Sequence, residues 1–381
     1  MSRSYDVIVA GLGAMGGGAC DHLAGRGLSV LGLDRLAPPH ALGSSHGESR
    51  IIREAYFEDP RYVPLVQRAY ECWSALERDT GRALLQVTGG LMIGPPDGTL
   101  VRGAIRSAET HGLSFERLDA AAMRARFPQF AVRDSEVAVR EPRAGVLDPE
   151  ACVSAQLERA VQRGAELERD RPVTSWRATH SGIEVETPRG RERAAQLVLA
   201  AGAWLPALLG ADVLPLTVER MVLYWFGAAR DPESFAPERL PIWIWEHEKD
   251  RYCYGFPALQ RGIKVARHHE GELCAPETAR REVSDAEIAG MRAWVEQHLP
   301  DAAGALRGTA TCLYTNTPDY DFVLDRHPAH ANVLIVSACS GHGFKFANAI
   351  GEVIADLLMD GRSRFDLAPF RLARFAAGAR G

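Results

Sequence analysis

Features that would place this chain in a specialised class are missing from its sequence. No apolar run is long enough to span a membrane. The 7 cysteines are odd in number and form no CxxC pair, which argues against a disulfide framework and a zinc ribbon. The 44 basic residues are outnumbered by 49 acidic ones, so the chain has no basic surplus of the kind that nucleic-acid-binding proteins show. We therefore expect no membrane partner, no nucleic-acid partner and no metal site.

A targeting segment is also not recognisable. The first apolar stretch belongs to a strand–turn–helix unit rather than to a signal or transit peptide, and a cytoplasmic location is expected. What the chain does have is an ordinary globular composition, with 46% hydrophobic and 24% charged residues. Its 381 residues exceed the size at which a single core usually stops growing, which predicts two packed lobes.

The N-terminus carries the pattern of a dinucleotide-binding unit. A short apolar run, Tyr5 to Ala10, is typical of a buried parallel strand, and the turn Gly11-Leu12-Gly13-Ala14-Met15-Gly16 follows it directly. A second apolar run, Ser29 to Leu33, ends at the acidic Asp34. A GxGxxG turn between a strand and a helix, with an acidic residue after the second strand, predicts a bound dinucleotide. The motif alone does not separate FAD from NAD.

Each part of this turn has a physical role. Gly11 permits the tight turn, Gly13 lets the backbone approach a pyrophosphate, and Gly16 lets the helix pack closely on the strand. The helix N-terminus presents its partial positive charge to the phosphates. Asp34 would accept hydrogen bonds from the adenosine ribose.

A second segment points to the same kind of unit. Ala195 to Ala201 is an apolar run that predicts a buried strand beneath the nucleotide, and it leads into Gly202-Ala203-Trp204. The preceding segment 171–174 reads as extended and could lie along the adenine through Val173. On its own, Val173 is more simply explained as an ordinary strand residue.

Signals of the dinucleotide fold recur in three separate regions, so the chain does not divide at one linker. Residues 215–300 carry alternating aromatic residues that suit antiparallel strands, and a long helix is expected over Asp285 to Leu299. We predict an α/β fold in which a Rossmann-like binding domain is interrupted by an α+β substrate lobe with a mainly antiparallel sheet. The predicted binding domain comprises residues 1–85, 145–214 and 305–381, and the substrate domain comprises residues 86–144 and 215–304.

A polar segment from Gly43 to Tyr56, GSSHGESRIIREAY, carries His46, Arg50 and Arg53 before an apolar, helix-like stretch. Helical spacing would place Arg50 and Arg53 on one face. Two arginines on one face fit an anion, either a flavin phosphate or a substrate carboxylate. A solvated basic face is about as compatible with this spacing.

The segment from Tyr252 to His269 joins an aromatic strand to a turn and presents Lys264 four residues before His268. A lysine on a mostly apolar strand could express its charge in a buried site. A strand-edge lysine that points to solvent is the commoner case, and the spacing does not decide between the two.

A glycine-rich loop lies between the last predicted strand and the last long helix. Residues Asn332 to Leu358 contain a buried strand, the loop Ser340-Gly341-His342-Gly343 and a helix that begins near Lys345. The backbone N–H groups of the loop and the helix N-terminus would stabilise negative charge on a reduced flavin, and Lys345 extends from the same place.

Four segments together make the sequence similar to a known family: GLGAMG, GSSHGESRIIREAY, CLYTNTPD and SGHGFKFANAIGEV. The sequence resembles the monomeric sarcosine oxidase and N-methyltryptophan oxidase family, within the wider D-amino-acid-oxidase-like flavoproteins. The resemblance runs over nearly the whole chain, and the last two segments are specific when they occur together. It implies an FAD cofactor and a monomeric enzyme.

The resemblance also implies roles for individual residues. Cys312 matches the cysteine whose sulfur bonds covalently to the 8α position of FAD. Lys264 matches the lysine that activates O₂ through a water, and Arg53 and Lys345 match the pair that holds the substrate carboxylate. The remaining matches are active-site and flavin-face residues: His268, Tyr254, Tyr314, Arg50 and His46.

Two features depart from the family pattern. Trp243 and Trp245 lie where the family varies its pocket wall, so we expect Trp245, together with Tyr254, to contact a substrate other than sarcosine. Arg267 and His269 surround the active-site histidine with additional charge. The residues expected to contact FAD are Gly11, Gly13, Ala14, Met15, Gly16, Asp34, Arg35, Ser44, Arg50, Val173, Ala201, Gly202, Trp204, Cys312, Gly341, His342, Gly343, Phe344 and Lys345.

The expected reaction is oxidation of a small secondary amine, an N-methyl or cyclic amino acid, to an imine, with O₂ reduced to H₂O₂. One alternative is a flavin dehydrogenase or a biosynthetic tailoring oxidase that uses another acceptor or a larger amine. An NAD-linked enzyme and a non-catalytic FAD-binding scaffold are further alternatives. In either of the latter two, Cys312, Lys264 and Lys345 would together be superfluous.

Overall fold

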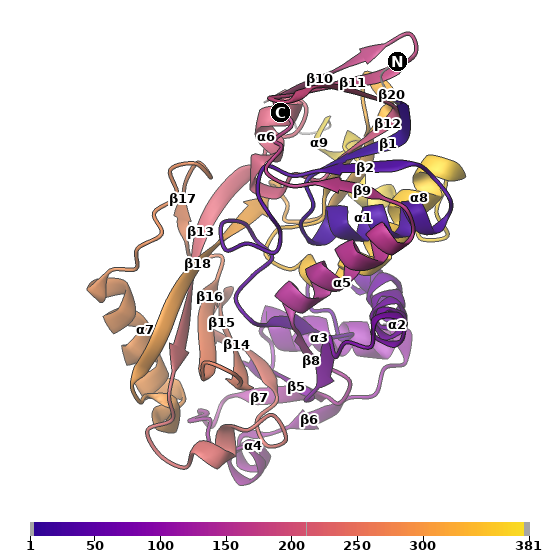
Figure 1. Ribbon diagram of the computed structural model, residues 1–381. Coiled ribbons are helices and arrows are strands. Elements are labelled where there is room, and N and C mark those ends of the chain that lie inside the picture. The colour runs from indigo at the N-terminus through magenta and orange to yellow at the C-terminus, as the bar shows by residue number, and fades with distance from the viewer. Residues whose placement is uncertain (1–3, 211, 377–381) are drawn as a thin grey trace.

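The computed structural model describes residues 4–210 and 212–376 (Figure 1). Residues 1–3, 211 and 377–381 fall within the predicted dinucleotide-binding segments and lie outside the described part. Two large sheets and one small sheet organise the described chain. The α/β fold class predicted from the sequence is confirmed.

The first sheet has eight strands, and parallel pairs form its centre. β1 pairs in parallel with both β2 and β12, β2 pairs with β9, and β12 pairs with β20. The strands are β1 (Ser4–Ala10), β2 (Val30–Leu33), β9 (Glu166–Glu168), β10 (Ser175–Thr179), β11 (Gly182–Thr187), β12 (Gly190–Leu199), β19 (Val323–His327) and β20 (His330–Ser337). Three helices, α1 (Ala14–Gly25), α5 (Pro149–Gln162) and α8 (Ala347–Met359), lie together on one side of this sheet (Figure 1).

The second sheet has nine strands and is mainly antiparallel, as predicted; β5 and β14 form its one parallel pair within the described chain. The strands are β5 (Gly90–Gly94), β6 (Glu116–Leu118), β7 (Val137–Glu141), β13 (Thr217–Phe226), β14 (Ile242–Glu248), β15 (Arg251–Ala258), β16 (Ile263–His268), β17 (Glu272–Leu273) and β18 (Leu306–Asn316). One face packs against α4 (Ala120–Arg126) and α7 (Asp285–His298), and the other packs against α3 (Thr99–His111).

Helix α7 confirms the expectation of a long helix after the aromatic strands. It begins at Asp285 because Ser284 and Glu287 form a capping box, in which each side chain accepts a hydrogen bond from the other residue's backbone N–H. The remaining α-helices of the described chain are α2 (Val63–Thr80), α6 (Leu205–Leu209) and α9 (Ala373–Ala376).

Strand β18 joins the two lobes in a way that the predicted division of the chain did not include. Residues 305–381 were assigned to the binding domain, yet β18 pairs with β13 from Thr217↔Asn316 to Phe226↔Leu306 in the second sheet. The chain returns to the first sheet only at β19. β18 therefore carries Cys312 and Tyr314 on the substrate-side sheet.

The prediction that Arg50 and Arg53 share a helical face is wrong. Arg50–Ile52 forms a strand, β3, in a three-stranded sheet with β4 (Leu85–Val87) and β8 (Gly145–Leu147). The apolar pair Ile51–Ile52 has β-branched side chains, which suit a half-buried strand better than a helix. Pairing with β8 decided the local conformation.

Across residues 4–210 and 212–376, no helix is long and apolar enough to cross a membrane. The same residues contain no group of three or more His, Cys, Asp or Glu side chains placed to hold a metal ion.

The close approach of α1 to β1 depends on Gly16, because a Cβ there would collide with the carbonyl oxygen of Gly11 and lie 3.4 Å from Val9 Cγ1. We expect Gly16→Ala to destabilise the fold by about 1–3 kcal/mol, the usual cost of overpacking. Thermal unfolding and the flavin content of the purified protein measure the effect.

Gly290→Ala is the matched control, because a Cβ at Gly290 in α7 meets nothing within 4 Å. It should raise stability by about 1 kcal/mol through helix propensity. Equal melting temperatures for wild type and Gly16→Ala would show that the close packing at Gly16 is not required.

Candidate active site

A cavity of about 500 Å³ lies between the two large sheets. One end is formed by the turn after β1 and by the segment after β12, and the other by β15, β16, β18 and the glycine-rich loop. Most predicted site residues line it: Gly11, Gly13, Ala14, Met15, Asp34, Arg35, Ser44, Arg50, Arg53, Val173, Ala201, Gly202, Trp204, Tyr254, His268, Cys312, Tyr314, Gly341, His342, Gly343, Phe344 and Lys345. Gly16, His46, Trp245 and Lys264 lie outside its lining.

The first end of the cavity has the features of a dinucleotide cradle. The N-cap of α1 is Gly13, which has no side chain to cap the helix; Ala14 N donates to Ser45 Oγ at 3.3 Å, and Gly13, Ala14 and Met15 line the cavity. At Gly13 an added Cβ would meet only Ser45 Oγ, at 3.6 Å, which leaves the backbone open to a ligand. Gly11 has φ +98°, and a Cβ there would lie 2.5 Å from the carbonyl oxygen of Ala200. These positions fit the diphosphate of a dinucleotide.

Asp34 shapes this end of the cavity. Its carboxylate accepts hydrogen bonds from the backbone N–H groups of Leu12 at 2.6 Å and Leu36 at 2.8 Å. Burial raises its pKa, while these two hydrogen bonds lower it. Nearby, the guanidinium of Arg35 lies 4.9 Å from the centre of the Trp204 ring. The acidic residue after β2 therefore holds the turn as well as facing the position expected for the ribose.

The opposite end of the cavity contains two buried cations. Arg53 is 2% exposed and forms an ion pair with Glu58 at 2.6 Å. Lys345 is 5% exposed, and its Nζ donates to the carbonyl oxygen of His342 at 2.7 Å. Burial and the neighbouring Arg53 lower the pKa of Lys345 to about 7. The charge of Arg53 is thus already compensated by Glu58, whereas Lys345 faces the cavity with a backbone carbonyl as its partner.

Aromatic and imidazole side chains form the wall between these two ends. His268 Nδ1 lies 3.4 Å from the hydroxyl of Tyr314, and the rings of His268 and Tyr254 have centres 6.3 Å apart. Burial, together with the nearby His269 and His342, lowers the pKa of His268 well below its usual value. Burial raises the pKa of Tyr254 to about 12. His268 is therefore neutral and Tyr254 protonated at neutral pH.

Lys264 contacts the polar segment that follows β2. It is 1% exposed, and its Nζ donates to Gly47 O at 2.7 Å, Ser49 O at 3.0 Å and Ser49 Oγ at 3.1 Å. The alternative of a lysine pointing to solvent is excluded. His46 is also buried, and burial followed by the charges of Arg50 and Lys264 lowers its pKa to about 3.

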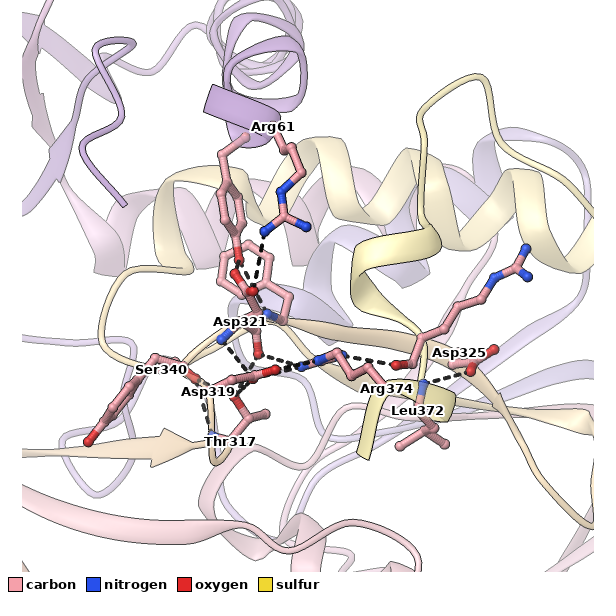
Figure 2. A network of polar contacts seen from close by, with 12 residues as sticks. Arg61, Thr317, Asp319, Asp321, Asp325, Ser340, Leu372 and Arg374 are labelled. Atoms are coloured by element: carbon pink, nitrogen blue, oxygen red, sulfur yellow. Dashed lines mark hydrogen bonds and ion pairs between the residues drawn. The ribbon is translucent and has the colours of Figure 1, made fainter. Parts of the chain in front are cut away.

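A polar network around residues 317–321 contacts the glycine-rich loop (Figure 2). Thr317 N donates to Ser340 Oγ at 3.3 Å, and the Arg374 guanidinium binds the Asp319 carboxylate at 2.6 Å. Asp321 accepts a hydrogen bond from the Tyr62 hydroxyl at 2.6 Å. Arg374 thus connects the C-terminal segment to residues 317–321, and Thr317 connects these residues to the glycine-rich loop.

Comparisons with known proteins identify the group to which these features belong. A sequence profile described as FAD dependent oxidoreductase matches residues 6–357. The chain is 45% identical to a monomeric sarcosine oxidase from Streptomyces avermitilis, over 99% of both chains. It is 37% identical to an N-methyl-L-tryptophan oxidase from Salmonella arizonae, over 98% of this chain and 99% of that one. The chain belongs to the FAD-dependent oxidoreductases, in the monomeric sarcosine oxidase and N-methyltryptophan oxidase family.

Solved structures show the same fold at lower identity. NikD, an amino acid oxidase essential for nikkomycin biosynthesis, superposes with a TM-score of 0.84 at 24% identity, over 97% of this chain and 98% of that one. L-Proline dehydrogenase from P. horikoshii superposes with a TM-score of 0.85 at 20% identity, over 99% of both chains. The superpositions show the fold that this oxidoreductase shares with both proteins.

The prediction that Trp245 contacts the substrate is wrong. Successive side chains of a strand point to opposite faces, and in β14 Ile244 faces the cavity. Trp243 and Trp245 consequently face α7, where Trp245 contacts Trp294 and donates from Nε1 to Glu136 at 2.9 Å. Both tryptophans belong to the core of the oxidoreductase's second lobe.

Sequence reasoning missed several residues at the cavity. Glu58 follows the predicted arginine segment closely, and an acidic residue so near two arginines was a usable signal of an ion pair. Cys339 lines the cavity one residue before the glycine-rich loop. Phe57, Ile51 and Phe256 complete the apolar wall. No sequence motif identifies these last residues, because sheet packing brings them together.

Proposed function

We propose that this enzyme oxidises the C–N bond of a small secondary amine that carries a carboxylate, an N-methyl or cyclic amino acid, to an imine, with O₂ reduced to H₂O₂. The observation that carries the proposal is Lys345, a buried lysine at one end of a cavity whose other end would bind FAD. The relatives named as sarcosine oxidase and N-methyl-L-tryptophan oxidase support the same chemistry.

Each residue contributes through its position and charge. Lys345 and Arg53 would hold the carboxylate, with Arg53 shared between the substrate and Glu58. Neutral His268 and the protonated hydroxyls of Tyr254 and Tyr314 would orient the amine. FAD, when bound, would accept the hydride equivalent that leaves the carbon as CH–NH becomes C=N, and the amine nitrogen would lose a proton. Water then hydrolyses the imine.

Lys264 would act in the second half of the reaction. Electron transfer to O₂ builds negative charge, and a fixed ammonium in a site without water favours that charge. Burial is required for this effect, because water would screen an exposed ammonium. The 1% exposure of Lys264 meets that requirement.

We predict that FAD is attached covalently through Cys312, which lines the cavity on β18 and is 1% exposed. Burial raises the pKa of its thiol above the usual value, and the charges of Arg50 and Lys264 nearby oppose this rise. Acid precipitation of the wild type should leave the yellow colour in the pellet, and Cys312→Ser should release it.

Cys339→Ser is the matched control, because this second cysteine also lines the cavity. It should retain the colour in the pellet. Flavin that dissociates fully from the wild-type protein would contradict covalent attachment.

We expect Lys264→Met to slow flavin reoxidation far more than flavin reduction. The side chain keeps its length but loses the charge that stabilises electron transfer to O₂. Removing one such stabilising group typically costs about 10²–10³ in rate. Stopped-flow measurement of the two half-reactions checks this. Equal slowing of both half-reactions would contradict it, and slow reoxidation of the wild type itself would favour a dehydrogenase that uses another acceptor.

Lys345→Met should impair turnover of an acidic amine and spare an uncharged amine of the same size. Loss of one partner of a desolvated charge contact costs roughly 2–5 kcal/mol, which is about thirtyfold to several thousandfold in kcat/KM. FAD content should not change. If both amines lose activity equally, Lys345 serves the flavin rather than the carboxylate.

The same contact predicts a pH dependence. A lysine with a pKa of about 7 is charged below pH 7 and neutral above it. Affinity for a carboxylate inhibitor should therefore fall by up to about tenfold per pH unit above 7 in the wild type, and this slope should be absent in Lys345→Met. His342, whose pKa is lowered to about 4, does not titrate in that range.

A further inference from the structure

Lysine is rare in this chain, and its placement is selective. Only 3 of the 44 basic residues are lysines, namely Lys249, Lys264 and Lys345. Lys249 is exposed, whereas Lys264 and Lys345 are 1% and 5% exposed. An ammonium is a compact point charge with three donors, which an arginine cannot reproduce. The surroundings of Lys264 should therefore be built for a small, fully bonded cation.

The acceptors of Lys264 come from a tight turn with unusual backbone angles. Gly47 and Glu48 have φ values of +98° and +68°, and Ser49 N donates to Gly47 O at 2.8 Å. This turn aims Gly47 O, Ser49 O and Ser49 Oγ at Nζ. Three acceptors match the three protons of an ammonium, so the turn favours the charged form.

Backbone angles in the left-handed region cost conformational free energy at Glu48, which is not a glycine. The turn therefore needs a partner that stabilises these angles. Glu150 provides it from the first turn of α5. Its carboxylate accepts from Gly47 N at 2.6 Å, and from Glu48 N at 3.3 Å and 3.2 Å through its two oxygens. Successive N–H groups in such a turn form a concave anion-binding surface, and the carboxylate occupies it.

Glu150 is not used to cap its own helix. Asp148 does that, by accepting from Ala151 N at 2.9 Å. The Glu150 side chain is thereby free to reach the turn. Both sides of the Gly47–Glu48 peptide group are consequently engaged: the Glu48 N–H donates to the carboxylate, and the Gly47 carbonyl oxygen accepts from the Lys264 ammonium.

We propose that Glu150 is a positioning residue that holds the Gly47–Ser49 turn in place and thereby fixes the Lys264 ammonium for reaction with O₂. The proposal rests on the function proposed above for Lys264. The carboxylate of Glu150 adds a negative charge, and its effect reaches the ammonium through the Gly47–Glu48 peptide group.

The charges around Lys264 act in both directions. Burial, followed by the charge of Arg50, lowers the pKa of Lys264 well below its usual value, and the charges of Cys312, Glu150 and Glu48 oppose this shift. Glu48 is itself paired with Arg261 at 2.9 Å, and the neighbouring His46 is neutral because its pKa is about 3. Glu150 thus supports the charged form of Lys264 both by its charge and by holding the acceptors.

The test uses the FAD-loaded enzyme and a graded pair of variants. Glu150→Gln keeps an acceptor for Gly47 N and loses the charge, and Glu150→Ala loses both. Reoxidation should slow on the order of tenfold in Glu150→Ala, the usual scale for partners that orient a functional group, and less in Glu150→Gln. Flavin reduction should not change. Glu158→Gln, on the same helix, is the control, because Glu158 is half exposed and pairs only with Arg82, at 2.7 Å, within the described chain.

A second readout does not depend on activity. With lysine labelled by ¹⁵N at Nζ, the protein gives three side-chain NMR signals, which Lys→Met variants assign. The Lys264 signal should titrate about one pKa unit lower in Glu150→Gln than in the wild type. The Lys249 signal should not move. A merely structural role for Glu150 would change the melting temperature without changing this titration.

The two readouts separate failure of the proposal from failure of the proposed function. Unchanged reoxidation and an unchanged Lys264 titration in both Glu150 variants would overturn the positioning role, whatever Lys264→Met does. If Lys264→Met reoxidises at the wild-type rate, the O₂ role of Lys264 is wrong. In that case, a shifted Lys264 signal in the Glu150 variants would still show that Glu150 positions the lysine.

Discussion

Three cationic side chains lie almost wholly out of water around one cavity, and the free-energy cost of burying charge constrains what can surround them. An isolated buried charge is unfavourable by several kcal/mol unless partners replace its hydration. Arg53 is compensated by Glu58, Lys264 by three backbone and hydroxyl oxygens, and Lys345 by a single carbonyl. The degree of compensation decreases in that order, and for the two lysines it matches what each is proposed to do. A fixed charge for O₂ needs full compensation, whereas a site for an incoming anion must leave part of the charge unmet.

The fold supplies these partners from segments that are far apart in the sequence. The turn at Gly47 lies between β2 and β3, Lys264 lies on β16 in the second sheet, and Glu150 lies in the first turn of α5. Strand β18, also in the second sheet, brings Cys312 and Tyr314 to the same cavity. Because the cavity lies between two sheets, each wall belongs to a separately packed core. Packing on both sides would hold the site in one geometry, which the proposed orientation of an amine against FAD would require.

The outcome at individual residues shows where sequence patterns suffice. The GxGxxG turn and Asp34 were recognised because a diphosphate imposes the same local geometry wherever it binds, and that geometry needs glycine at fixed spacings. The motifs around Cys312 and the glycine-rich loop identified the family for a similar reason. Arg50 and Arg53 were correctly placed at the cavity, yet their local structure was predicted wrongly, since Arg50–Ile52 is a strand. The β-pairing with residues 145–147, which decided it, is a long-range contact that local spacing does not encode.

The sequence alone determined the cofactor class, the family and the presence of an inserted antiparallel sheet, because each depends on short motifs or on alternation within one segment. Tertiary structure alone decided which face of each strand meets the cavity. Trp245 and Ile244 are neighbours in β14, and a shift of one residue in register would have exchanged their places. It also decided which charges are paired: nothing local indicates that Glu150 holds the turn around Lys264. Such pairings depend on how separate elements pack, and the desolvation that makes them energetically significant exists only once the two lobes enclose the cavity.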